Sequence, residues 1–165
     1  MSLIPLLLKE FDREAETTRK MLSRIPDDKY DWKPHQKSMD VRTLSTHIAD
    51  LPNWVPMAIN TEQLDFADSN WSTPIVNSTA DLLAFFEKSY KDGREILEKA
   101  DESKFNELWT LRNGAEIYST EPKYEVIRMS ISQTIHHRAQ LGVFLRLLNV
   151  PIPGSYGPSA DEMSS

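Results

Sequence analysis

The chain has 165 residues, of which 39% are hydrophobic and 27% are charged, and its formal net charge is −6. The negative charge and the lack of any basic run argue against nucleic-acid binding, which needs clustered lysine and arginine. The absence of cysteine excludes disulfides, thiolate metal sites and a cysteine nucleophile.

This length supports one well-packed domain, so we expect residues 1–165 to form a single domain with an extended C-terminal tail over 151–165. The N-terminal segment has a short apolar run without a basic leader or a small-residue cleavage site, which argues against a signal peptide. No segment approaches the roughly 18 apolar residues of a membrane span. We therefore expect a cytoplasmic protein without a membrane or nucleic-acid partner.

Apolar residues at helical spacing predict a first helix over residues 3–25, with Glu14 among the charged residues of its solvent face. Pro26 ends this helix. A second helix is predicted to begin with Ser38 as its N-cap. Its apolar stripe contains His47, and Pro52 predicts a kink or break after Leu51.

Residues 60–77 form a polar connection that is long for a compact domain, and we expect them to cross along the bundle. Ser78 and Asp81 are typical of a capping box at the start of a third helix. Gly93 costs about 1 kcal/mol relative to alanine in mid-helix, which indicates a close helix–helix approach there.

Two short apolar segments around Arg112-Asn113-Gly114 predict a hairpin before the last helix. Ser119 or Thr120 is the expected cap of that helix, and Pro151 lies beyond its end. The predicted fold class is therefore all-α: a four-helix bundle with a long crossover connection and one small β-hairpin.

The apolar stripe of the last helix places His137 inside the bundle, whereas His136 lies on its flank. Gln133 lies one turn before His137, and His47 occupies an equivalent stripe position in the second helix. Two imidazoles and an amide from facing helices can hold one divalent ion, most plausibly zinc or nickel, and leave a coordination position open. The alternative is a pair of hydrogen-bonded core histidines, because glutamine is a poor ligand.

Several segments resemble the signature regions of the DinB/YfiT family. These are Trp32–Ser38, Leu44–Leu51, His136–Pro153 and Tyr156–Asp161. The resemblance implies a four-helix bundle, usually dimeric, with a divalent metal held by three side chains. The matching positions here are His47, Gln133 and His137, and the family's usual residue at the middle position is histidine.

The resemblance also implies chemistry, because the family includes thiol S-transferases that use bacillithiol or mycothiol, a thiol isomerase and members without known activity. Three hypotheses follow. The first is a metal-dependent enzyme that transfers a low-molecular-weight thiol to an electrophile, in stress response or detoxification. The second is a non-catalytic metal-binding or stress-response bundle, and the third is a homodimeric member whose metal site has decayed at Gln133. For an active site, we expect the open metal position to face a cleft near Trp54.

Overall fold

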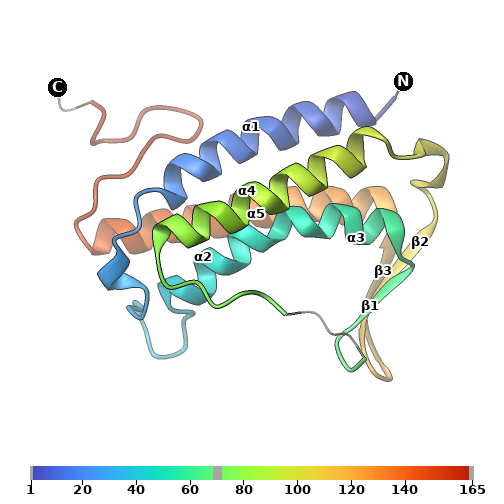
Figure 1. Cartoon of the computed structure of the whole chain (residues 1–165), viewed down its shortest axis with the longest axis horizontal. Coiled ribbons are helices and arrows are strands. Elements are labelled where there is room, and N and C mark those ends of the chain that lie inside the picture. Colours follow the sequence, from blue (N-terminus) through green and yellow to red (C-terminus); the bar gives the residue numbers. More distant parts are fainter. Residues whose placement is uncertain (1, 69–71, 164–165) are drawn as a thin grey trace.

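The structure, a computed structural model, describes residues 2–68 and 72–163. Parts of the predicted domain and of the predicted connection fall on residues 1, 69–71 and 164–165, which lie outside the described residues. The described residues form a helical bundle with a small sheet at one end (Figure 1). Its α-helices are α1 Ile4–Leu22, α2 Val41–Asp50, α3 Trp54–Asn60, α4 Thr79–Glu98 and α5 Lys123–Leu147.

The helices pack around shared apolar faces. Helix α1 packs on α4 and α5, and α2 and α3 both pack on the same two helices. Because α2 and α3 follow each other along one side of the bundle, together they take the place of one long helix (Figure 1). This arrangement is consistent with the predicted four-helix bundle.

The predicted break in the second helix is confirmed. Helix α2 ends at Asp50, a single 3₁₀ turn spans Leu51–Asn53, and α3 begins at Trp54. Pro52 has no backbone N–H to donate to the preceding turn. The predicted cap was wrong: Asp40 is the N-cap of α2, and its carboxylate accepts a hydrogen bond from the Thr43 N–H at 2.7 Å.

The expectation of an all-α fold was wrong in one respect, because the structure contains a three-stranded mixed sheet. Strands β2 (Leu108–Asn113) and β3 (Glu116–Pro122) form the predicted hairpin. Strand β1 (Gln63–Asp65) lies in the connection and pairs parallel with β2. A three-residue strand is too short for period-two alternation to show in the sequence, so this pairing was missed.

The start of α5 also differs from the prediction. Ser119 and Thr120 lie within β3, Pro122 is the N-cap, and the helix begins at Lys123. The backbone N–H of Lys123 donates to the Glu107 carbonyl at 2.9 Å. The carbonyl of the residue before β2 thus accepts from the first N–H of α5, where we had expected a side-chain cap.

Gly93 confirms the predicted close approach between helices. It lies in α4 opposite the break, where an added Cβ would stand 2.6 Å from the Pro52 carbonyl oxygen and 3.1 Å from Cζ of Phe11. The α4 backbone therefore packs directly on the 3₁₀ turn between α2 and α3.

Gly93→Ala is expected to lower the free energy of unfolding by about 1–3 kcal/mol, because the methyl group collides with a backbone oxygen that cannot move aside. The intrinsic helix preference of alanine works in the opposite direction by about 1 kcal/mol. Gly142→Ala is the matched control, since its Cβ would meet only side-chain atoms, the nearest at 3.5 Å. Urea unfolding measures both, and equal stabilities of the two variants would contradict the packing described here.

Candidate metal centre

His47 and His137 face each other across the contact between α2 and α5. The centroids of their rings lie 4.8 Å apart, and the ring planes are inclined by 74°. Both side chains are half-buried, so neither imidazole is in bulk solvent. Although 90 positions separate these residues in the chain, the predicted approach of the two histidines is confirmed.

A neighbouring amide orients the His137 ring. Its Nδ1 lies 2.7 Å from Oε1 of Gln140, one turn further along α5. In the tautomer with the proton on Nδ1, this nitrogen donates to the amide oxygen, and Nε2 keeps its lone pair. Such a partner on the far nitrogen is typical of metal-ligating histidines.

Burial lowers the pKa of His47, and the nearby His137 lowers it further by charge repulsion. The neutral imidazole is therefore the main form of His47 at pH 7. A neutral ring is the form that binds a metal, so no proton has to be displaced at this pH.

His136 lies on the exposed flank of α5, as predicted, but its ring does not point away from His137. Its ring centroid is 4.9 Å from that of His137, while the side chain is exposed. Among the described residues, no group of three or more histidine, cysteine, aspartate or glutamate side chains is placed to hold a metal ion. The donor set predicted from the sequence thus depends on the half-buried amide of Gln133 for its third member.

A cleft of about 380 Å³ opens beside His47. Its walls come from the segment just before α2, from one face of α2 and from part of the α3–α4 connection, residues 61–78. They consist of Met39, Arg42, Thr43, Thr46, His47 and residues 73–76. Trp54 is not part of this wall; it is buried and packs on Trp109 with ring centroids 6.4 Å apart. The cleft beside His47 therefore faces the connection and is not lined by Trp54, and the expectation that an open metal position faces a cleft near Trp54 stays a prediction.

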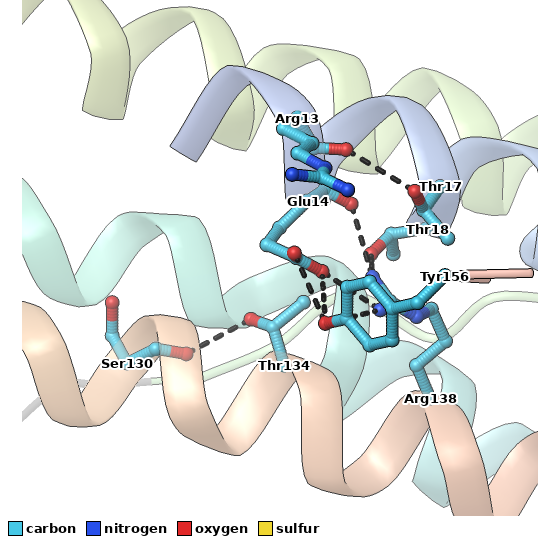
Figure 2. A network of polar contacts seen from close by, with 8 residues as sticks. All are labelled: Arg13, Glu14, Thr17, Thr18, Ser130, Thr134, Arg138 and Tyr156. Carbon is cyan, nitrogen blue, oxygen red and sulfur yellow. Dashed lines mark hydrogen bonds and ion pairs between the residues drawn. The ribbon is translucent and has the colours of Figure 1, made fainter. Parts of the chain in front are cut away.

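The most deeply buried charge of α5 is a residue that our sequence analysis did not single out. The Arg138 side chain is 2% exposed, and its Nη2 lies 2.7 Å from Oε2 of Glu14, which is 7% exposed (Figure 2). Arg138 Nη1 donates to the Glu14 carbonyl at 3.2 Å and to the Thr18 hydroxyl at 3.0 Å. This ion pair joins α1 to α5 inside the bundle.

The C-terminal tail completes the network. The Tyr156 hydroxyl donates to the Glu14 carboxylate, 3.0 Å from each oxygen, and accepts from Arg138 Nη2 at 3.2 Å (Figure 2). Burial raises the pKa of Tyr156, and the hydrogen bond to Glu14 raises it further, so the hydroxyl remains a donor. Together these contacts hold the tail against α1 and α5.

The burial of Glu14 and Arg138 was not predicted from the sequence, for two reasons. Glu14 was assigned to the solvent face of the first helix, and the stripe of the last helix was centred on His137. The buried stripe is centred instead near Thr134, Arg138 and Leu141. The spacing of Arg138 was the available signal. It follows the buried Thr134 by four residues and precedes the buried Leu141 by three, which is the spacing of one helix face.

The comparisons with known proteins agree with this architecture. No curated protein matches the chain. A DinB-like protein from Bacillus subtilis superposes with a TM-score of 0.71 at 16% identity, over 91% of this chain and 97% of that one. A DinB-like protein from Bacillus cereus gives 0.71 at 18% identity, over 91% and 95%. The mycothiol-dependent maleylpyruvate isomerase gives 0.61 at 15% identity, over 84% of this chain and 60% of the isomerase.

None of the helices that the structure describes is both long and apolar enough to cross a membrane. The model of the DinB family matches residues 1–164. The family resemblance inferred from short segments therefore extends over almost the entire chain, and this protein belongs to the DinB family.

Proposed function

We propose that this protein is a divalent-metal-dependent thiol S-transferase, and the facing pair of His47 and His137 is the observation that carries the proposal. Three further features support it. Burial keeps His47 neutral, Gln140 orients His137, and a cleft beside His47 leaves room for substrates. One structural neighbour, the mycothiol-dependent maleylpyruvate isomerase, links the same fold to thiol chemistry.

In this proposal His47 and His137 hold zinc or nickel, and Gln133 is a weak third ligand. When bound, the ion lowers the pKa of a thiol and so supplies thiolate at neutral pH. The thiolate sulfur forms a bond to an electrophilic carbon of the acceptor, and the leaving group departs with the bonding electron pair. The thiol proton passes to solvent, and the charges balance.

We further propose that the protein acts as a cytoplasmic homodimer in stress response or detoxification.

A second candidate function is metal binding without catalysis. It is favoured by the donor set, because within the described residues no third histidine or carboxylate is placed to hold an ion together with the pair. A neutral amide gives a weaker centre than a third imidazole. A metal-storing or sensing role would tolerate that weakness, whereas a transferase needs the ion to stay bound through turnover.

Reconstitution of the chelator-treated protein with zinc or nickel tests the proposal. We expect about one ion per chain for the wild type by element-resolved mass spectrometry, and at least about tenfold weaker binding for His47→Ala. His35→Ala is the control, because His35 lies exposed in the loop before α2 and should not change the affinity.

Turnover of monobromobimane with a panel of low-molecular-weight thiols then separates the two candidate functions. Metal-dependent turnover that His47→Ala abolishes supports the transferase. A stoichiometric ion without turnover supports the non-catalytic function. If wild type and His47→Ala bind metal equally, both proposals are wrong.

A further inference from the structure

A second and larger cavity, of about 640 Å³, follows the cleft beside His47 along the same side of the bundle. Its walls come from α2, α3, the connection and α4, and they include Asp50, Asn53, Met57, Leu64, Ser72 and Phe85. This volume is in the range of cavities that enclose a small molecule. The two candidate functions of the histidine pair do not involve this cavity.

The two cavities succeed each other along one helix face. Thr46 and His47 line the smaller cavity, whereas Asp50 and Asn53 line the larger one. Thr46 and Asp50 are one helical turn apart, a rise of about 6 Å. The connection contributes to both, with Ser72 in the larger cavity and residues 73–76 in the smaller.

The part of the connection that forms the outer wall of the smaller cavity is anchored at Val76 and Asn77. Arg42 donates to the carbonyl of Val76, to Oδ1 of Asn77 at 2.9 Å and to Oδ1 of Asp31 at 2.8 Å. The connection is thereby tied to α2 at Arg42, five residues before His47. A molecule between α2 and the connection would meet a formed wall.

The character of the larger cavity indicates what it binds. Asn53 donates its amide hydrogens to Asp50 Oδ1 at 3.1 Å and to the Ser89 hydroxyl at 3.0 Å, so both donors of this side chain are engaged within the protein. Met57, Leu64 and Phe85 supply apolar surface, and no lysine or arginine lines the cavity within the described residues. The match is to an uncharged, mainly apolar molecule.

Thr46 lies in the wall of the smaller cavity, one helical turn before Asp50 of the larger one. Its hydroxyl oxygen is buried, and no hydrogen-bond partner for it exists among the described residues. An unmade hydrogen bond of this kind is costly to leave inside a protein. A polar group of a bound molecule that reached this hydroxyl would remove that cost.

We propose that the larger cavity binds the non-reacting body of the acceptor, an uncharged alkyl or aromatic electrophile, while the reacting carbon lies in the smaller cavity beside His47. This inference rests on the proposed transferase function. It makes Met57, Leu64 and Phe85 the residues that select the acceptor, whereas the histidines select the ion.

Binding of N-phenyl-1-naphthylamine, an uncharged apolar fluorophore, to the metal-free full-length protein tests the cavity independently of catalysis. We expect saturable binding to the wild type and at least about tenfold weaker binding to Met57→Trp, because the indole takes up part of the cavity and blocks the bound position of the fluorophore. Asn60→Trp narrows the same cavity from an exposed position and provides a second variant if the first folds poorly.

The matched control is Val143→Trp, in a different apolar groove, of about 430 Å³, between α5 and the tail. This variant should bind the fluorophore as the wild type does. The proposal is overturned if Val143→Trp abolishes binding, or if folded Met57→Trp and Asn60→Trp bind as tightly as the wild type.

Turnover of a series of 1-bromoalkanes with a low-molecular-weight thiol tests the role of the cavity in the reaction. For the wild type, KM should fall about fourfold per added methylene until the cavity is full, with little change in kcat. In Asn60→Trp this dependence should disappear, while zinc binding stays at the wild-type level. If the wild type does not bind zinc, the proposed function is overturned. If it binds zinc and turns over the bromoalkanes but KM does not change with chain length, only this inference is overturned.

Discussion

Arg138→Met is expected to lower the free energy of unfolding by about 3–5 kcal/mol, because it leaves the Glu14 carboxylate buried without its cation. Methionine approximates the length of the arginine stem, so the loss reports the charge rather than a large cavity. Urea unfolding of the metal-free protein at pH 7 measures the effect. A loss below about 1 kcal/mol would mean that the Glu14 carboxylate is solvated in the folded protein.

Two further variants assign this loss to the ion pair. Arg138→Met combined with Glu14→Leu should recover most of the stability, since removal of both charges leaves no unpaired buried ion. Tyr156→Phe should cost only about 1 kcal/mol, because it removes one hydroxyl from a side chain that is largely exposed. If the double variant is no more stable than Arg138→Met alone, the arginine stabilises the protein by packing and not by its charge.

Gln133→His is expected to tighten zinc and nickel binding by at least about tenfold, because an imidazole replaces a weakly donating amide one turn from His137. Gln133→Leu should weaken binding, since it removes the third donor. Isothermal titration of the metal-stripped protein measures all three affinities. Because the backbone of α5 is helical throughout this region, neither substitution should change the fold.

Ser132→His is the matched control for an added histidine. Ser132 is exposed and lies about 100° around the helix from residue 133, so its imidazole points away from the facing pair. Metal affinity should not change in this variant. Equal affinities for wild type, Gln133→His and Gln133→Leu would show that residue 133 does not contact the ion, and the model with three protein ligands would be wrong.

The sequence alone was sufficient for the features that depend on local chemistry or on periodicity. Pro52 breaks the second helix because a proline removes a backbone donor wherever it stands. Ser78 caps α4 by accepting from the Asp81 N–H at 3.1 Å, a contact that spans only three residues. His47 and His137 meet because each lies on a buried or half-buried stripe, and in a helical bundle such stripes face one another.

The tertiary structure decided the features in which a residue's partner is distant in the chain. Strand β1 forms because it pairs with the free edge of β2. A three-residue segment is too short for its sequence pattern to predict that pairing. Arg138 and Glu14 are buried because each supplies the counter-charge of the other across 124 positions, whereas either residue alone would be expected on the surface.

The orientation of the candidate site was likewise a tertiary result. Helical periodicity places a side chain to within about half a turn, which was enough to bring His47 and His137 together but too coarse to give the direction of the cleft. That direction is set by the connection, whose residues 73–76 cover the outer face of α2. The path of an irregular segment depends on side-chain anchors such as Arg42 and not on a repeating pattern, and for that reason only the folded chain reveals it.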